Sequence, residues 1–407
     1  METGAPLSQF PLILVSSSFE LDLIEVIKAL FASGVKPRAA DRMEADPILV
    51  AGGMSLTLNP EPWSPVVDLA ILGEGETAIL QWLQIFSDRL DFGLNRAALR
   101  RESAVLPFVY VPAAPSRSAP VAAFYDDYSR NPASSSVVHP AGHFGDCWLV
   151  EVTRGCPRGC LFCVVRRVSP ARFAQEDAIL EKMADRGCLG AKKVGLVGGA
   201  VGDHPALKRL IRAILQTGRN ITVSSLRIER CDEELIELLA QGGMKTLTVA
   251  PETGDEALRR TLGKNATDED LLRMARWAAR TKIRRIRLYF LIGLPQREPP
   301  EKILSLVRRL RRETPSDLHF DLSVSSFIPK PGTPWGDAPF APAAELDAVK
   351  QRLRTEIRRI PGVTVRFEAT RKEHSAAMIS KGDAALGEAL IRAVEQERPL
   401  EQVLRKA

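Results

Sequence analysis

Short apolar runs and one amphipathic segment alternate over the first part of the chain. The apolar runs predict buried strands at 11–19, 47–53 and 68–76. Apolar positions at helical spacing predict a helix over 20–34. Strands that alternate with helices favour a small parallel sheet covered by helices. We therefore expect an α/β domain over residues 1–90.

Residues 91–145 have a different composition. A short helix is expected from Arg96 to Glu102, but the chain from Pro112 to Pro140 is rich in Pro, Ala and Ser. Such a sequence buries little apolar surface, so we interpret this segment as a linker that runs over the surface.

Apolar strands again alternate with amphipathic helices over residues 146–335. The expected strands are 148–155, 192–199, 220–227, 245–252, 285–295 and 319–327. Their spacing favours a parallel barrel of six strand–helix units. Residues 336–407 predict a helix over 344–360, a strand over 363–369 and a helix over 385–397, which we interpret as a C-terminal cap.

Three of the six cysteines lie together in the sequence EVTRGCPRGCLFC, at Cys156, Cys160 and Cys163. Three thiolates so close in sequence favour a compact metal site, and an iron–sulfur cluster is the usual occupant of such a site. A cubane cluster has four irons, so three cysteines leave one iron open. Zinc is an alternative, but a closed zinc site needs four ligands. A disulfide framework is another, although a long chain without a secretory signal is expected to keep its thiols reduced.

Composition sets broad limits on the protein. A chain of 407 residues with 45% hydrophobic content can form two or three domains. No apolar run reaches the ~18 residues of a membrane span, so we expect a cytoplasmic protein without a membrane partner. The net charge of +6 permits a polyanionic partner without requiring one.

The motif CPRGCLFC resembles the signature of the radical S-adenosylmethionine (SAM) superfamily. The resemblance implies one 4Fe–4S cluster whose open iron binds the amino and carboxylate groups of SAM, and cleavage of SAM to a 5′-deoxyadenosyl radical. It also implies an α/β fold with a partial TIM-type (β/α)6 barrel, and an electron donor of the flavodoxin or ferredoxin type. The other cysteines, Cys147, Cys188 and Cys231, are scattered, so no second cluster is expected.

In parallel barrels the chemistry lies at the carboxyl ends of the strands. The resemblance implies that the residues there contact SAM: Gly198, Gly199, Ser225, Arg227, Glu252, Gly293, Leu294 and Pro295. Glu252 stands where the family places an acid on the SAM ribose, and a carboxylate can accept from both hydroxyls. Ala200 departs from the family, which has an acid after the two glycines. Plain turns and a helix cap at Glu252 are the structural alternatives.

The first domain resembles a reduced, Rossmann-like cobalamin-binding domain. Its turns Gly52-Gly53 and Gly73-Glu74-Gly75-Glu76 follow predicted strands, where open α/β sheets bind ligands, although plain turns would show the same pattern. No histidine precedes His139, so the histidine that ligates cobalt in this family is missing. Cobalamin is therefore possible but not favoured.

The sequence predicts an enzyme that abstracts hydrogen from an unidentified substrate, either a small molecule or RNA. The first alternative is a cobalamin-dependent methyltransferase without a histidine ligand to cobalt. The second is a non-enzymatic iron–sulfur or RNA-binding protein, suggested by arginine-rich segments at 273–285 and 308–312. No catalytic residue of the chain itself can be assigned from the sequence.

Overall fold

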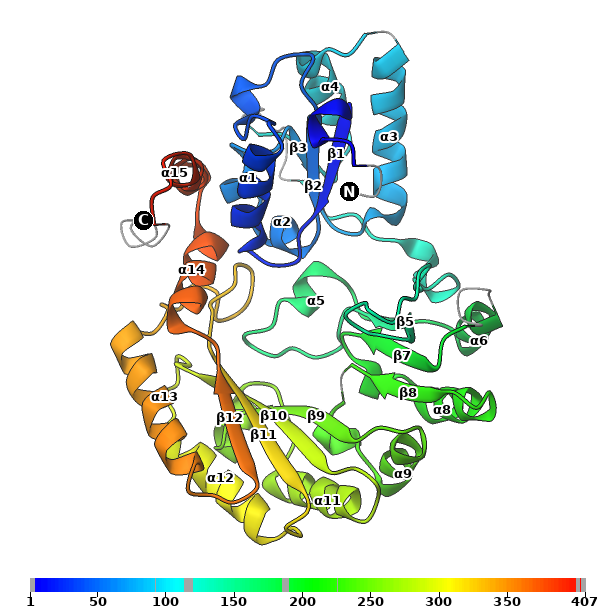
Figure 1. Ribbon diagram of the computed structural model, residues 1–407, viewed down its shortest axis with the longest axis vertical. Helices are drawn as coiled ribbons and strands as arrows, with labels where there is room; N and C mark the ends of the chain where they lie inside the picture. Colours follow the sequence, from blue (N-terminus) through cyan, green and yellow to red (C-terminus); the bar gives the residue numbers. More distant parts are fainter. Residues whose placement is uncertain are drawn as a thin grey trace. The chain divides into compact units, whose positions relative to one another are not determined.

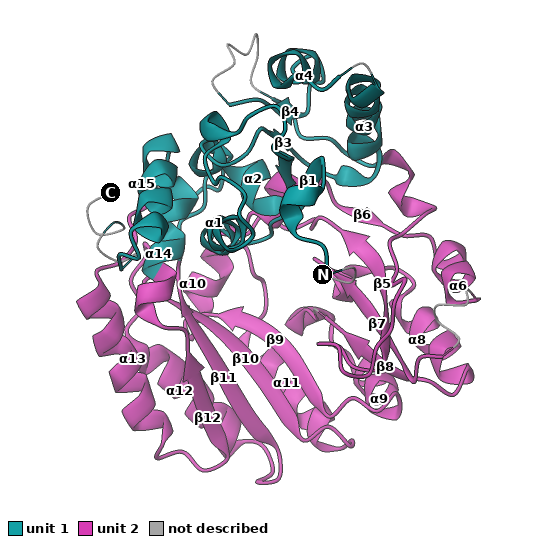
Figure 2. Ribbon diagram, turned by 45° about the horizontal axis from the view of Figure 1, so that its top comes forward, with its two compact units in different colours: residues 1–125, 328–337, 374–407 teal, residues 126–327, 338–373 magenta. Residues whose placement is uncertain are grey.

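The computed structural model describes residues 4–91, 93–112, 120–184, 190–224, 226–399 and 403. The chain forms two compact units, coloured separately in Figure 2. Unit 1 comprises residues 1–125, 328–337 and 374–407, and unit 2 comprises residues 126–327 and 338–373. The four-part division expected from the sequence, with boundaries near 90, 145 and 335, stays a prediction.

Unit 1 is built on a four-stranded sheet in the order β1-β2-β3-β4. Its strands are β1 (Leu12–Ser16), β2 (Ile48–Gly52), β3 (Leu69–Ile71) and β4 (Val109–Tyr110). The first three are parallel, as their apolar runs predict. The short β4 pairs antiparallel with β3, so part of the expected linker completes this sheet.

Both faces of β2 and β3 are buried, which explains why these strands are continuously apolar. Alternate residues, such as Leu49 and Ala51 of β2, share a core with helix α1 (Asp22–Ala32). Their neighbours, such as Val50, pack against α3 (Gly75–Asp91) on the other face. Figure 1 shows α1 and α3 on opposite sides of β1–β3. The remaining helices of the first 125 residues are α2 (Met54–Leu58) and α4 (Arg96–Ser103).

The last helices of the chain contribute to unit 1. α14 (Thr370–Lys381) was not predicted, and α15 (Ala384–Glu395) was; both add apolar side chains to the core on the α1 face. Arg38 donates to Glu388 at 3.0 Å and to Glu395 at 2.9 Å. The C-terminal segment is therefore an integral layer of this unit.

A buried carboxylate joins the loops at one edge of the same sheet. Asp68 is 1% exposed and accepts from Arg42 at 3.0 Å, Arg96 at 2.8 Å and Arg100 at 3.1 Å. The backbone N–H of Leu49 also donates to it, at 2.9 Å. Because a buried charge is costly unless it is paired, this arrangement fixes the entry to β3.

Unit 2 contains two four-stranded sheets, in the orders β6-β5-β7-β8 and β12-β11-β10-β9. Their strands are β5 (Cys147–Arg154), β6 (Arg172–Phe173), β7 (Lys193–Gly198), β8 (Asn220–Val223), β9 (Thr246–Glu252), β10 (Arg285–Ile292), β11 (His319–Ser326) and β12 (Val363–Phe367). The pairs are parallel except for β5 with β6. All six expected barrel strands are present, which confirms the partial TIM-type barrel. Among the described residues, no ladder joins β8 to β9.

Amphipathic helices cover the outer face of these strands (Figure 1). They are α6 (Glu176–Ala184), α8 (Leu207–Gln216), α9 (Glu233–Gln241), α11 (Asp268–Ala279), α12 (Pro300–Arg312) and α13 (Ala343–Ile357), and the shorter α5 (Val165–Val168) and α10 (Glu256–Thr261) lie in loops. α8 shows the pattern clearly, because Leu207, Leu210, Ile211 and Ile214 are buried while its charged residues are more exposed.

The strand expected in the C-terminal cap extends the barrel sheet instead. β12 lies parallel to β11, with Phe320 in register with Val363. Just beyond β12, Glu373 accepts from the backbone N–H of Ser326 at 2.6 Å and from Lys350 at 2.7 Å. This buried contact fastens the end of β11 to α13 and α14. No helix among the described residues is long and apolar enough to cross a bilayer.

Candidate functional site

A cavity of about 200 Å³ in unit 2 collects the three clustered cysteines and the charged ends of the barrel strands. Its wall includes Cys156, Cys160, Cys163, Arg227, Glu252 and Lys264. The cysteines come from the loop after β5, and the other residues follow β8 and β9. The structure thus brings together side chains that lie up to about a hundred residues apart in sequence, at the edge where parallel barrels place their chemistry.

Glycines shape the cysteine loop. Gly155 has a φ of 69°, and a Cβ there would lie 2.3 Å from the carbonyl oxygen of Pro170. The loop is docked by a hydrogen bond from the Leu161 N–H to the Leu262 carbonyl at 3.2 Å. A Cβ on Gly263 would come within 3.3 Å of the Cys160 Cα. The loop therefore packs backbone to backbone against the segment that carries Lys264.

The three cysteines are free thiols and only partly exposed. Burial raises the pKa of the Cys160 thiol to about 11, although the Lys264 ammonium opposes that rise. Among the described residues, no three side chains converge as the ligands of one metal ion do. In a cubane cluster each thiolate binds a different iron, so three thiols spread over one cavity wall are compatible with a cluster.

Glu252 occupies a strained position at the end of β9. Its φ of 67° is in the left-handed region, which a non-glycine residue seldom adopts, and its residue surface is 8% exposed. Lys264 donates to its Oε1 at 2.5 Å and to the Ala250 carbonyl at 2.7 Å. Burial raises the pKa of Glu252, and the Lys264 ammonium counteracts this. The helix-cap alternative is wrong, because Asp255 is the N-cap of α10.

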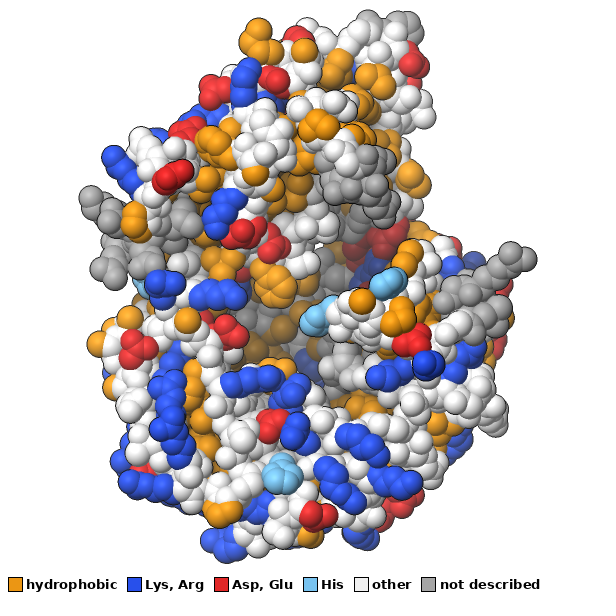
Figure 3. Space-filling model, in the orientation of Figure 1, with side chains coloured by type: hydrophobic (Ala, Val, Ile, Leu, Met, Phe, Trp, Pro, Cys, Tyr) orange, Lys and Arg blue, Asp and Glu red, His pale blue; other side chains and the backbone are white. Residues whose placement is uncertain are grey.

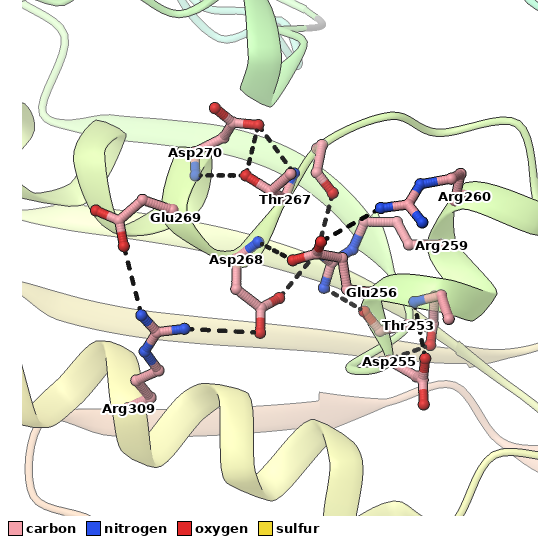
Figure 4. Close-up of polar contacts among 12 residues, drawn as sticks. Thr253, Asp255, Glu256, Arg259, Arg260, Thr267, Asp268, Glu269, Asp270 and Arg309 are labelled. Carbon is pink, nitrogen blue, oxygen red and sulfur yellow. Dashed lines mark hydrogen bonds and ion pairs between the residues drawn. The ribbon is translucent and has the colours of Figure 1, made fainter.

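A fully buried arginine holds the loop between Glu252 and Lys264 (Figure 4). Arg259 is 0% exposed and donates to the Thr253 and Ala266 carbonyls and to Asp268, each at 3.0 Å. These bonds tie both ends of the loop to the start of α11. Arg259 therefore positions Glu252 and Lys264 without reaching the cavity wall itself.

Gly198 and Gly199 allow the ends of β5 and β7 to approach closely. A Cβ on Gly198, whose φ is 148°, would lie 2.1 Å from the Thr153 carbonyl oxygen. A Cβ on Gly199 would lie 2.7 Å from the carbonyl oxygen of Gly155. Gly199 lines the cavity, whereas Gly198 acts behind it. Their residue type is thus required by packing, whatever else they contact.

Asp203 lies in the same cavity and was missed by the sequence reasoning. A 3-10 turn over Val201–Asp203 follows Ala200, and the Asp203 N–H donates to the Ala200 carbonyl at 2.9 Å. Its side chain is 7% exposed, and Arg227 donates to Oδ1 at 2.7 Å. Burial raises the pKa of Asp203. Its Oδ2 is buried, and no described group donates to it. A residue that lines the cavity therefore carries a buried acceptor oxygen with no donor among the described groups.

Not every predicted residue reaches this cavity. Ser225 lies outside the described residues. Gly293, Leu294 and Pro295 do not line it, and a Cβ on Gly293 would meet the Leu346 side chain at 2.7 Å. Lys264 was missed, although a basic residue shortly after an expected ligand-binding acid was a usable signal.

A second cavity, of about 310 Å³, lies at the carboxyl ends of β1, β2 and β3 in unit 1. Gly52, Gly53, Gly73 and Gly75 line it together with aliphatic side chains, and none of the described residues in its lining is charged. The predicted glycine turns thus border a cavity at the ligand-binding edge of an open α/β sheet.

Comparisons with known proteins agree with this architecture. Residues 1–112 match the family described as radical SAM proteins, N-terminal, and residues 150–310 match the radical SAM superfamily. An uncharacterised protein of Methanocaldococcus jannaschii is 26% identical over 99% of this chain and 87% of its own length. One of Methanopyrus kandleri is 26% identical over 54% of this chain and 44% of its own.

Among solved structures, the radical SAM methyltransferase TsrM of Kitasatospora setae, determined with cobalamin and a 4Fe–4S cluster bound, has a similar fold. The TM-score is 0.58 at 15% identity, over 95% of this chain and 88% of TsrM. The fold agreement, the two family matches and the cysteine loop after the first barrel strand lead to one conclusion: this chain belongs to the radical SAM superfamily of enzymes, whose fold implies a 4Fe–4S cluster and SAM.

Proposed function

We propose that this protein binds a single 4Fe–4S cluster through Cys156, Cys160 and Cys163, and abstracts hydrogen from a substrate. The observation that carries the proposal is the single cavity that these cysteines share with Glu252 and Lys264. When bound and reduced, the cluster supplies the electron that breaks the C5′–S bond of SAM, giving methionine and a 5′-deoxyadenosyl radical.

The residues present fit SAM as a ligand. Asp203 Oδ2, which has no donor among the described groups, is a suitable acceptor for the SAM amino group. In the family this contact comes from the acid that Ala200 replaces here. Lys264 holds one oxygen of Glu252, which leaves the other for a ribose hydroxyl. Arg227 lines the same wall and is held in place by Asp203 and Glu229, whose carboxylates offset its charge.

One cluster per chain is the expected content. Cys147 and Cys231 are buried, and burial raises the pKa of both thiols, to about 12 for Cys231. Neither residue lines the cavity that the three clustered cysteines share, so neither is placed to join them, and Cys188 lies outside the described residues. Iron analysis should therefore find roughly four irons per chain.

Anaerobic reconstitution followed by incubation with SAM and dithionite tests the proposal. Mass spectrometry should detect 5′-deoxyadenosine from the wild-type protein and none from the variant with Cys156, Cys160 and Cys163 all replaced by Ala. Cys147→Ala is the matched control and should keep both the cluster and the product. Retention of the cluster absorbance near ~400 nm by the triple variant would remove these residues as ligands.

A cobalamin-dependent methyltransferase is the second candidate. The glycine-lined cavity at the ends of β1–β3 favours it, as does the fold shared with TsrM, whose structure contains cobalamin. Without a histidine before His139, a corrinoid would bind without an imidazole from the first 125 residues, which carry the glycine-lined cavity. S-adenosylhomocysteine as the main product, dependent on added methylcobalamin, would favour this candidate over hydrogen abstraction.

The expected partners are a flavodoxin- or ferredoxin-type electron donor and a substrate in the cytoplasm. The arginines that suggested RNA are mostly bound to the protein's own acids. Arg276 pairs with Glu269 and Glu313, and Arg308 pairs with Glu356. A solvated helix face accounts for this pattern. The non-enzymatic alternative is wrong, because the chain is a radical SAM enzyme.

A further inference from the structure

The sheet β9–β12 has one apolar face and one polar face. On β10, Ile286, Leu288 and Phe290 are at most 1% exposed and belong to the outer face, which the helices cover. Because side chains alternate along a strand, Arg285, Arg287 and Tyr289 point to the inner, concave face. Figure 3 shows basic side chains gathered over the region of β10–β12 on that face.

Arg287 is a partly buried cation without a counter-ion. Its Nε is buried without a hydrogen-bond partner, and no described acid lies within ion-pair distance of its guanidinium. Asp321 is its register neighbour on β11, but that carboxylate is paired with Arg285 at 3.2 Å and accepts from Thr364 at 2.8 Å. Burying an unpaired charge is costly, so Arg287 is expected to lower the free energy of unfolding.

Arg366 of β12 lies on the same face and likewise has no acidic partner among the described residues. Arg366 is in register with Ser323, and Ser323 is in register with Tyr289. Two strand spacings and a two-residue offset separate Arg287 from Arg366 by about 12 Å between Cα atoms. Two long guanidinium side chains at that separation are able to engage one anionic group. Tyr289, 36% exposed, adds a hydroxyl on the same face.

The patch made by Arg287, Tyr289 and Arg366 is set back from the cofactor cavity. Arg287 is in register with Thr248, four residues before Glu252, which corresponds to about 13 Å along β9. An anion held there would leave the rest of a small molecule to extend toward the strand ends. The charges of Arg285 and Asp321 cancel, so these strands present two uncompensated positive charges on this face.

We propose that the patch binds the carboxylate or phosphate end of a small anionic substrate and so orients its reacting carbon toward the cofactor cavity. The inference rests on the proposed function for the position of the reacting carbon, but the anion site itself does not depend on it. Planar guanidinium groups match both anions, because each offers paired N–H donors to two oxygens.

Calorimetry with malonate and with inorganic phosphate, at ionic strength matched by sodium chloride, tests the site on the anaerobically reconstituted protein. One of the two anions should bind the wild type, and its identity distinguishes a carboxylate from a phosphate substrate. Arg287→Met and Arg366→Met should each weaken that binding roughly tenfold or more. Arg312→Met is the matched control, since Arg312 of α12 is exposed and has no described acidic partner.

Thermal unfolding and SAM cleavage separate a lost site from a damaged protein. Arg287→Met should unfold no earlier than the wild type, because it removes an unpaired charge, and Arg287→Lys should retain part of the binding. Both variants should still release 5′-deoxyadenosine from SAM. Absence of cleavage in the wild type would refute the proposed function while leaving the anion measurement intact. Equal binding by all variants, no binding, or binding of a short oligouridylate alone would overturn the small-anion site.

Discussion

Replacing Arg259 by Met tests whether the loop that carries Glu252 and Lys264 is held from behind. The change deletes three hydrogen bonds of 3.0 Å from a side chain that is 0% exposed. It leaves two buried carbonyls unsatisfied, while Met fills much of the volume of the arginine stem.

The expected loss can be bounded from these contacts. Breaking a buried charged pair costs about 3–5 kcal/mol. Asp268 has 25% of its side chain exposed and lies 4.0 Å from Arg309, so water and a second cation replace part of what it loses. We therefore expect a decrease of about 3 kcal/mol in the free energy of unfolding. SAM should also bind about tenfold more weakly, because the residues facing the ligand lose their fixed position.

Urea unfolding of anaerobic protein measures the first effect, and hydrogen exchange of peptides spanning 252–268 measures the local one. Arg260→Met is the matched control, because Arg260 is the next residue in the chain, is exposed, and makes one described side-chain contact, with Glu256 at 3.5 Å. The control should lose less than about 0.5 kcal/mol. A similar stability and similar exchange in both variants would show that Arg259 does not hold the loop.

Three further predictions follow from buried groups. Asp68→Asn should lower the free energy of unfolding by about 3–5 kcal/mol in urea titrations, because it leaves its arginines without a counter-ion; a loss below 1 kcal/mol would contradict this. Glu252→Gln should keep the iron content but weaken SAM binding by about 1–3 kcal/mol in calorimetry, and unchanged affinity would remove Glu252 from the site. Burial lowers the pKa of His204 in the folded state. As the pH drops below about 6.5, the free energy of unfolding should therefore decrease, by up to about 1.4 kcal/mol per pH unit. A pH series of urea titrations should show a smaller decrease for His204→Gln.

The reason for the His204 prediction lies in its two ring nitrogens. Nδ1 accepts from the Ala206 N–H at 3.1 Å, and Nε2 lies 2.9 Å from the Ala174 carbonyl. Only the neutral ring with its proton on Nε2 satisfies both contacts. The folded state therefore binds a proton at His204 less tightly than the unfolded state does. The stability that the neutral ring contributes is present above the ordinary pKa of histidine and is lost as the pH falls below it.

The barrel strands could be predicted because local pattern and tertiary burial agree in them. Each of the six strands predicted between 148 and 327 is present, and the cysteine motif follows the first of them, at the carboxyl end of β5. β12 was recognised as a strand but assigned to the cap. Its five residues alone do not reveal that β11 offers a free edge at Phe320–Val324.

The cavity beside the clustered cysteines was only half predictable. Cysteine spacing and the strand-end rule found Cys156, Cys160, Cys163 and Glu252. Asp203 lies three residues beyond Ala200, and only the 3-10 turn shows that it returns to the cavity. Arg259 was not singled out in the sequence, because its burial depends on how the loop folds the Thr253 and Ala266 carbonyls around it.

The chain path between the units has a consequence for biosynthesis. The core beside α1 includes Ile379, Leu386, Leu390 and Ile391, although the strands it covers are formed from the first 72 residues. The apolar side of α1 that these residues cover therefore stays exposed while the ribosome synthesises some three hundred further residues. During that interval the nascent chain has an exposed apolar surface that chaperones can bind. Unit 1, whose synthesis begins first, is therefore among the last parts of the chain to complete its core.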